Sequence, residues 1–409
     1  MIERELYLNQ IKPYMNKHII KVLTGIRRSG KSTILKQIAN QLKNDGVSDE
    51  NIILINLELE KYLDIRNWKQ LSSLINSMLN NKGKNKNNNN NRKYLFLDEV
   101  QKVEGWEKLV NAYFAEDKFD IYVTGSNAKL LSGELATYLS GRYIEIKIYP
   151  FSFREFLKYN KKHKINKKTS DFFKDYINYG AMPSTLKYKN HRKIPVLRDI
   201  YNTIILKDIV SRYEIKDIDL LTRILLFLMG NIGQLFSANS IVKYLKKDNV
   251  KISTKTIYNY LTYLEDVSFI NKVKREDLVG KKLLNFIEKF YLVDLGFRQM
   301  IYGNNEKDIG QSLENIVYNE LLRQGYDITI GKFKDKEVDF VCKKHNKKIY
   351  IQVAYILAEE STIKREFDPL MKINDNYPKY VLSMDEFDRS KEGIKHINII
   401  DFLTGDALL

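Results

Sequence analysis

Residues 25–32 read Gly-Ile-Arg-Arg-Ser-Gly-Lys-Ser, a complete P-loop of the form G-x-x-x-x-G-K-[ST]. Backbone N–H groups of such a loop surround the phosphates of a nucleotide, Lys31 reaches the β- and γ-phosphates, and Ser32 ligates Mg²⁺. The apolar run 19–24 predicts a buried strand before the loop. The apolar spacing over 33–42 predicts a helix after it, whose positive N-terminal end points at the anion.

The whole segment from the first glycine to the start of the helix is therefore the predicted binding site for ATP and Mg²⁺. Its residues are Gly25, Ile26, Arg27, Arg28, Ser29, Gly30, Lys31, Ser32 and Thr33. Arg27 and Arg28 are basic beyond what the motif requires. They either touch the nucleotide or a neighbouring subunit, or lie on a solvated face of the loop.

A second apolar run, 94–97, ends in Asp98-Glu99 and looks like a Walker B motif. ATP hydrolysis needs a carboxylate that holds the Mg²⁺ shell and a group that orients the attacking water. We assign Asp98 to the metal, together with Ser32, and Glu99 to catalysis. The alternative is an acid pair at a helix N-terminus, which the upstream P-loop disfavours.

A third apolar run, 119–124, ends in Gly125-Ser126-Asn127. A polar side chain there would lie between the P-loop and the Walker B strand, close to the γ-phosphate. Asn127, with Ser126 as the alternative, is therefore a candidate sensor that takes part in catalysis.

Arg142 lies between a predicted helix over 128–139 and a predicted strand over 143–148. From this position an arginine can reach the nucleotide of a neighbouring subunit and stabilise charge on the transferring phosphoryl group. A surface arginine near a helix C-terminus, favoured by the macrodipole, is an equally good interpretation.

Composition limits the class of protein. A chain of 409 residues predicts two to three domains, and 44% apolar residues are ordinary for a globular chain. The sequence has no apolar stretch long enough to span a bilayer, no signal-peptide pattern and one cysteine, Cys342, so we expect a cytoplasmic protein without disulfides. The polar run 82–91 predicts a surface loop.

The formal net charge is +17, from 68 basic and 51 acidic residues. Such an excess is typical of proteins that bind nucleic acid. The abundance of Lys, Asn, Ile and Tyr is also what an A+T-rich genome favours, so charge alone decides little.

Three regions follow the predicted nucleotide-binding core of residues 1–150. Residues 151–218 are predicted helices that form a lid over the nucleotide. Residues 219–298 have the layout of a winged helix, with a helix over 254–266 capped by Ser253 and wing strands at 269–273 and 290–293.

The exposed face of the third helix in this region would carry Lys255, Tyr258, Asn259 and Thr262, and the wing carries Lys274. Such a face contacts double-stranded DNA in a recognition helix. Winged helices also serve as interaction modules, which leaves both interpretations open.

Residues 308–409 contain a predicted helix with Glu314, a strand with Asp339 and a strand with Gln352. This order resembles the metal site of restriction-endonuclease-like folds. Such enzymes need a second carboxylate where Gln352 lies and a lysine where Ala354 lies. We therefore expect a catalytically degenerate domain.

Taken together, the motifs resemble bacterial and archaeal AAA+ ATPases with a winged helix and a C-terminal restriction-endonuclease-like domain. The motifs that carry the resemblance are 24–32, 97–101, 124–127 and 139–142, with weaker matches at 180–183, 291–296 and 337–340. It implies an α/β fold with a parallel-sheet core, ATP and Mg²⁺ as cofactors, and homo-oligomers that assemble through nucleotide interfaces.

Three functions remain open from the sequence. The first is an ATPase whose hydrolysis drives conformational change on DNA. The second is a nucleotide-gated signalling or scaffolding switch without DNA contact. An ATP-regulated nuclease is the third and the least favoured, because of Gln352 and Ala354.

Overall fold

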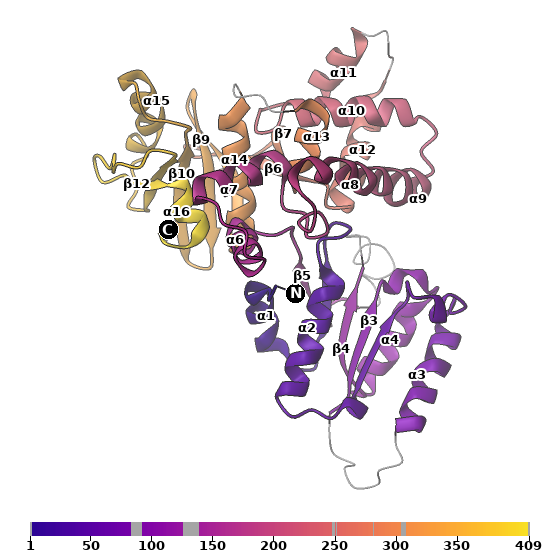
Figure 1. The fold of residues 1–409 in the computed structure, drawn as a ribbon. Helices are drawn as coiled ribbons and strands as arrows, with labels where there is room; N and C mark the ends of the chain where they lie inside the picture. Colours follow the sequence, from indigo (N-terminus) through magenta and orange to yellow (C-terminus); the bar gives the residue numbers. More distant parts are fainter. Residues whose placement is uncertain are drawn as a thin grey trace. The chain divides into compact units, whose positions relative to one another are not determined.

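The computed structural model describes residues 2–82, 92–125, 139–247, 250, 252–280, 282–303 and 308–407. The chain divides into two compact units, Met1–Tyr149 and Pro150–Leu409, and each is described by itself (Figure 1). The predicted loop over 82–91 and the predicted helix over 128–139 lie, except at their ends, outside the described residues.

The described part of the first unit is built on a five-stranded parallel sheet with the strand order β2-β3-β4-β1-β5. Its strands are β1 (Ile20–Thr24), β2 (Ile52–Asn56), β3 (Tyr94–Asp98), β4 (Asp120–Thr124) and β5 (Tyr143–Lys147). The carboxyl ends of parallel strands meet at one edge of the sheet. The residues that follow β1, β3 and β4 therefore lie together, and the predicted P-loop α/β core is confirmed.

Helices cover both faces of this sheet, which is why its strands are almost wholly apolar. Leu23, Phe96 and Tyr122 pack with α1 (Glu5–Ile11) and α2 (Lys31–Asn44). Their strand neighbours, such as Val22, Leu95 and Leu97, face the other way and pack with α3 (Trp68–Lys82) and α4 (Trp106–Ala115). Short 3₁₀ turns are η1 (Lys12–Tyr14), η2 (Asp49–Asn51), η3 (Glu60–Tyr62) and η4 (Val100–Lys102).

Helices occur along the whole length of the second unit. They are α6 (Phe153–Lys162), α7 (Thr169–Tyr179), α8 (Asn190–Thr203), the π-helix η6 (Ile204–Val210), α9 (Ser211–Tyr213), α10 (Ile218–Gly230), α11 (Ala238–Lys246), α12 (Thr254–Asp266), α13 (Gly296–Tyr302), α14 (Ile309–Arg323), α15 (Glu360–Met371) and α16 (Ile399–Thr404). Helices α7 and α8 pack against α13, and α6 contacts α16. The predicted lid region is thus part of the second unit, and its role as a lid stays a prediction.

One mixed sheet runs through this unit. Its described strands follow the order β12-β11-β10-β9-β8-β6-β7. They are β6 (Ile270–Asp277), β7 (Lys282–Leu292), β8 (Asp327–Phe333), β9 (Lys336–Lys344), β10 (Lys347–Val353), β11 (Lys379–Ser383) and β12 (Lys395–Asn398).

The predicted wing is the antiparallel hairpin of β6 and β7, but β6 also pairs in parallel with β8, where Arg275 lies opposite Ile330. The regions predicted as 219–298 and 308–409 therefore share a single sheet.

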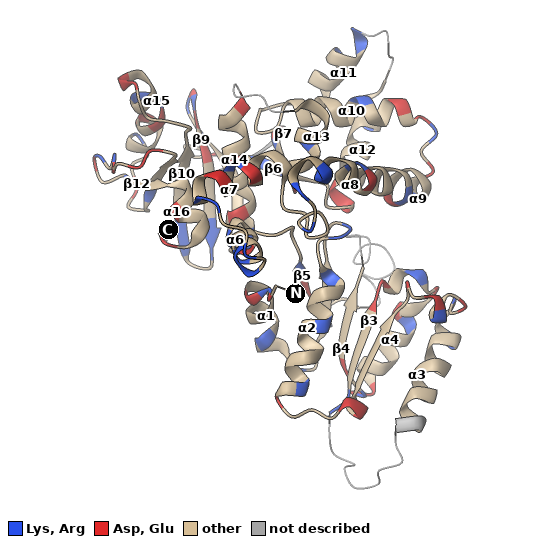
Figure 2. Ribbon diagram, viewed as in Figure 1, with Lys and Arg blue, Asp and Glu red and all other residues tan. Residues whose placement is uncertain are grey.

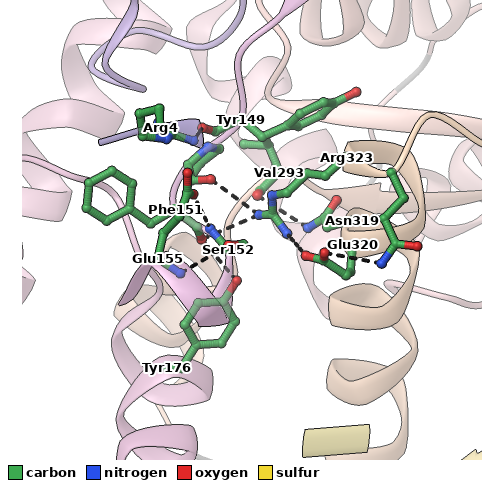
Figure 3. Close-up of polar contacts among 12 residues, drawn as sticks. Arg4, Tyr149, Phe151, Ser152, Glu155, Tyr176, Val293, Asn319, Glu320 and Arg323 are labelled. Atoms are coloured by element: carbon green, nitrogen blue, oxygen red, sulfur yellow. Dashed lines mark hydrogen bonds and ion pairs between the residues drawn. The ribbon is translucent and has the colours of Figure 1, made fainter. Parts of the chain in front are cut away.

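The start of the second unit is fixed by buried polar contacts. Tyr176 on α7 donates a hydrogen bond of 3.1 Å to the carbonyl oxygen of Phe151, and Arg323 on α14 donates to the same oxygen at 3.5 Å (Figure 3). Arg323 also forms an ion pair of 3.2 Å with Glu320. A lone buried charge would be costly, so the ion pair with Glu320 stabilises the buried guanidinium of Arg323. The hydrogen bond from Arg323 to Phe151 connects α14 to the start of the second unit.

Surface features agree with the sequence where the structure describes them. Ser253 caps α12 by accepting a hydrogen bond from the Thr256 N–H, and Lys255 and Tyr258 are exposed, as predicted. Lysine and arginine residues lie on many elements of both units (Figure 2). Among the described residues, no helix combines the length and apolar character needed to cross a membrane.

Candidate functional site

The phosphate loop lies between β1 and α2, and its lysine is already oriented within it. Nζ of Lys31 donates hydrogen bonds to the carbonyl oxygens of Gly25 at 2.9 Å and Ile26 at 3.2 Å. Lys31 is 4% exposed. A buried ammonium group favours an anion such as a phosphate as a binding partner.

The first glycine of the loop is required by its surroundings. Gly25 has φ +129°, and a Cβ atom there would lie 2.2 Å from the carbonyl oxygen of Ile148, directly after β5. Only glycine combines this backbone conformation with this close approach. The contact fixes the start of the loop against the end of the sheet.

Arg4, which lies immediately before α1, supports the loop. It is 1% exposed, and its guanidinium donates to the carbonyl oxygens of Ser29 at 3.0 Å and Tyr149 at 2.9 Å. The guanidinium carbon of Arg4 also lies over the ring of Tyr7, 4.7 Å from the ring centroid. Nothing in the sequence around Arg4 predicts this role, because the partners are distant in the chain.

The two predicted metal-binding residues meet. Oγ of Ser32 donates a hydrogen bond of 3.0 Å to Oδ1 of Asp98. Thr124, the last residue of β4, donates to the same Oδ1 at 2.5 Å and accepts from the Glu99 N–H at 3.0 Å. Burial raises the pKa of Asp98 and outweighs these hydrogen bonds, which lower it. A nearby cation would favour the ionised carboxylate.

Glu99 lies directly after β3 with φ +57°, an uncommon backbone conformation for a glutamate. The amide of Gln101 donates a hydrogen bond of 2.6 Å to its Oε2. Thr124 thus holds the backbone of Glu99, and Gln101 holds its side chain. Sequence reasoning missed both; for Thr124, its position at the end of the neighbouring strand was the available signal.

The remaining loop residues differ in what they contact. Arg27 forms an ion pair of 3.5 Å with Glu58, whereas Arg28 is exposed and has φ +64°. Thr33 is half-buried in the first turn of α2. The candidate sensor Asn127 and its alternative Ser126 lie outside the described residues.

Arg142 is exposed and contacts its own chain. Its guanidinium donates a hydrogen bond to Oδ1 of Asn111 and lies 5.7 Å from the ring centroid of Phe114. Both partners are on α4. A guanidinium with these contacts can remain on the surface or turn toward another subunit, so the predicted arginine finger stays a prediction.

A nucleotide with Mg²⁺ fits this arrangement of residues. The hydroxyl of Ser29 is buried and has no hydrogen-bond partner among the described residues, and a phosphate oxygen would supply one. Ser32 and Asp98 would hold the metal, since both present oxygen atoms, the ligands that Mg²⁺ prefers. The first unit thus brings together Lys31, the predicted metal-binding residues Ser32 and Asp98, and Glu99.

The second unit contains a polar cavity of about 450 Å³ at the place where the resemblance predicts a nuclease site. Glu314, Asp339 and Gln352 line it, as predicted, and so do Glu337 and Glu366, which the sequence analysis did not single out. No group of three or more His, Cys, Asp or Glu side chains in the described part of the chain is arranged to hold a metal ion.

An unpredicted lysine reaches these carboxylates. Lys289 on β7 is buried, and its ammonium lies 2.8 Å from Glu314, 2.6 Å from Glu337 and 3.8 Å from Asp339. Burial alone would lower the pKa of Lys289, but the three negative charges outweigh it and raise the pKa. The sequence gives no signal for this, because Lys289 lies outside the predicted nuclease-like region.

Comparison with known proteins agrees with the fold of the first unit. Residues 17–157 match a family described as an AAA domain, and residues 170–308 match a domain of unknown function, DUF8612. The Walker-type ATPase PABY2304 of Pyrococcus abyssi has a similar fold, with a TM-score of 0.51 and 16% identity over 73% of this chain and 95% of that one. The first unit therefore has the P-loop α/β fold, and most of it matches the AAA domain family.

Two relatives are similar over almost the whole chain. An uncharacterized protein of Haemophilus influenzae is 38% identical over 404 residues, 98% of each chain. The uncharacterized protein MJ1544 of Methanocaldococcus jannaschii is 33% identical over 408 residues, which are 96% of this chain and 86% of that one. The chain belongs to the family that these two proteins represent.

Proposed function

We propose that the protein binds ATP with Mg²⁺ and hydrolyses it to ADP and phosphate. The observation that carries this proposal is the contact of 3.0 Å between Ser32 and Asp98, with Glu99 next in the chain. Ser32 lies in the first turn of α2 and Asp98 at the end of β3, and their convergence close to Lys31 is what a nucleotide-bound metal requires.

Each residue then has a role. Lys31 and the loop N–H groups bind the phosphates, Ser32 and Asp98 hold Mg²⁺, and Glu99 orients the attacking water. The metal, when bound, neutralises charge that develops on the phosphoryl oxygens. Asn127 is the proposed sensor of the γ-phosphate.

Two substitutions test this function. Lys31→Ala should abolish tight ATP binding, because it removes the cation from the β- and γ-phosphates. Glu99→Gln should bind ATP but release no phosphate, because an amide does not orient water as a carboxylate does. Binding is measured with a fluorescent ATP analogue and turnover by phosphate release.

Matched controls are Lys36→Ala on α2 and Glu104→Gln after η4, because both residues are exposed near the site but outside it. Both controls should keep wild-type activity. Hydrolysis at the wild-type rate by Glu99→Gln would show that Glu99 is not the catalytic residue.

We further propose that hydrolysis drives conformational change on double-stranded DNA. The exposed side chains of Lys255, Tyr258, Asn259 and Thr262 on α12 support this proposal, since polar and basic side chains on one helix face suit a major groove. The net charge of +17 favours association with phosphates.

The test is duplex binding as a function of salt. Lys255→Glu with Lys274→Glu should weaken binding, whereas Lys161→Glu, an exposed lysine on α6, should not. Wild-type affinity should fall steeply with salt as phosphate contacts are lost. Absent or salt-independent binding would favour the alternative function, a nucleotide-gated signalling or scaffolding switch.

The nuclease function remains the least supported. Gln352 is a neutral, poorer ligand for Mg²⁺ than a carboxylate, and Ala354 cannot activate water. We propose that residues 308–409 serve as a docking or DNA-binding surface. Incubation with linear, supercoiled and branched DNA and with RNA, in Mg²⁺ or Mn²⁺, should leave each substrate intact.

A further inference from the structure

A cation supplied by the chain, Lys289, contacts carboxylates that line the polar cavity of the second unit. The ammonium group of Lys289 lies between carboxylates from two elements, Glu314 on α14 and the pair Glu337 and Asp339 on β9. An ordinary ion pair has one carboxylate for one ammonium group, whereas three carboxylates lie around Lys289. Lys289 is 3% exposed, so water cannot replace these contacts.

The oxygen atoms that a metal ion would need are already engaged. Oδ2 of Asp339 accepts a hydrogen bond of 2.9 Å from the Val353 N–H, and Oε1 of Gln352 accepts one of 3.2 Å from the Asp339 N–H. Oε1 of Glu314 accepts from both Tyr291 and Lys289. The residues present therefore do not fit a divalent ion while Lys289 is in place.

Geometry makes the two cations mutually exclusive. A divalent ion binds carboxylate oxygens at about 2.0–2.6 Å. An ion on the Glu314 and Glu337 oxygens that face Lys289 would lie next to an ammonium that is itself 2.8 and 2.6 Å from them. Like charges this close repel strongly in a buried site.

We propose that Lys289 is a built-in cation that takes the place of a divalent metal ion among Glu314, Glu337 and Asp339. The lysine comes from β7, and the carboxylates come from α14 and β9, so the same contact ties the hairpin to the rest of the sheet. This inference is independent of the ATPase proposal, because it concerns only the second unit.

The proposal predicts that removing the lysine creates a metal site. Full-length Lys289→Met should gain about one bound Mn²⁺ per chain, because the buried Asp339 and the partly buried Glu314 and Glu337 lose their counter-ion and accept a hard cation instead. Mn²⁺ binding is measured by electron paramagnetic resonance without nucleotide. Each titration is repeated with the Asp339→Asn substitution added. Mn²⁺ bound at the P-loop is the same in both proteins, so the difference between the two titrations counts only the Mn²⁺ that depends on Asp339.

Lysine-specific controls are available near the same carboxylates. Lys336 lines the cavity but pairs with Asp368 at 3.2 Å, so Lys336→Met should gain no Mn²⁺. Lys289→Arg keeps the positive charge and should gain none either. Mn²⁺ should also raise the melting temperature of Lys289→Met by several degrees while leaving that of the wild type unchanged.

Three results would overturn the proposal. One is wild-type Mn²⁺ binding that Asp339→Asn abolishes. Another is a Lys289→Met protein with no Asp339-dependent Mn²⁺. The third is wild-type DNA cleavage that both Lys289→Met and Asp339→Asn abolish, which would make the lysine a catalytic group. If Lys289→Met does not fold, Lys289→Gln, which keeps a polar side chain at this position and all three carboxylates, is titrated in its place with the same expected Asp339-dependent gain of Mn²⁺.

Discussion

The hydroxyl of Thr124 donates a hydrogen bond of 2.5 Å to Oδ1 of Asp98 and accepts another from the N–H of Glu99. One side chain at the end of β4 thereby fixes both carboxylate residues at the end of β3. The proposed metal-binding residue, Asp98, and the proposed catalytic residue, Glu99, are linked through this threonine.

Thr124→Val should slow ATP turnover by about 10- to 100-fold, because a lost hydrogen bond to a charged group is worth about 1.5–3 kcal/mol. Thr124→Ser keeps the hydroxyl and should retain most of the activity. Phosphate release and ATP affinity are measured side by side, since the effect is expected on turnover. Equal activity of the valine and serine variants would remove Thr124 from the site.

Arg4→Met should lower both ATP affinity and the stability of the first unit. The substitution leaves the carbonyl oxygens of Ser29 and Tyr149 without their donor, at about 1–3 kcal/mol for each buried group. Both tryptophans, Trp68 and Trp106, lie in the first unit, so fluorescence during urea unfolding reports on that unit.

Arg66→Met, at an exposed position of the same unit, is the control for Arg4→Met and should unfold like the wild type. Unchanged unfolding of Arg4→Met itself would mean that the guanidinium contributes nothing to the loop.

Gly180→Ala should destabilise the second unit more than Gly303→Ala. The two glycines end α7 and α13 with nearly the same backbone conformation, φ +64° and ψ −166° against φ +67° and ψ −171°. A Cβ at Gly180 would lie 1.7 Å from Oδ1 of Asp294, whereas no described atom lies within 4 Å of one at Gly303.

The backbone cost, about 1–3 kcal/mol, should therefore be common to both variants. Displacing the buried Asp294 should add at least about 2 kcal/mol for Gly180→Ala alone. The free energy of unfolding is measured by circular dichroism in urea. Similar values for the two variants would show that Asp294 moves aside freely.

Arg142→Ala should lose ATP hydrolysis while retaining ATP binding if Arg142 acts on a neighbouring subunit. Mixing this variant with Glu99→Gln should then restore part of the activity, because some interfaces combine an intact Glu99 with an intact Arg142. Co-assembly is verified by pull-down of a tagged chain. Absence of rescue in co-assembled mixtures would favour a surface role, with Asn111 and Phe114 as its partners.

The sequence was sufficient for the parallel-sheet core because its strands are short apolar runs that end at recognisable motifs. The meeting of Ser32 with Asp98 also follows, since parallel strands place their carboxyl ends at one edge. Arg4 and Thr124 were missed because their partners are fixed by the tertiary fold. No local pattern marks the buried arginine, and the available signal for the threonine was its position at the end of the strand next to β3.

The second unit was harder to read for a physical reason. The pairing of β6 with β8 is parallel and joins residues far apart in the chain, as Arg275 with Ile330, and such pairing leaves no trace in local hydrophobic spacing. Lys289 was missed for the same reason. Its carboxylate partners lie on other elements of the chain, and they can be recognised only after the fold places β7 beside α14.

The position of β6 between β7 and β8 also makes the second unit a natural candidate for a split protein. A chain cut between α13 and α14 would leave β6 on one fragment and β8 on the other, each with an open row of backbone donors and acceptors. Each fragment would present the other with a matching template, in the manner of donor-strand complementation. Co-expressed halves should therefore reassociate, whereas either half alone should aggregate, which offers a reporter for assembly inside cells.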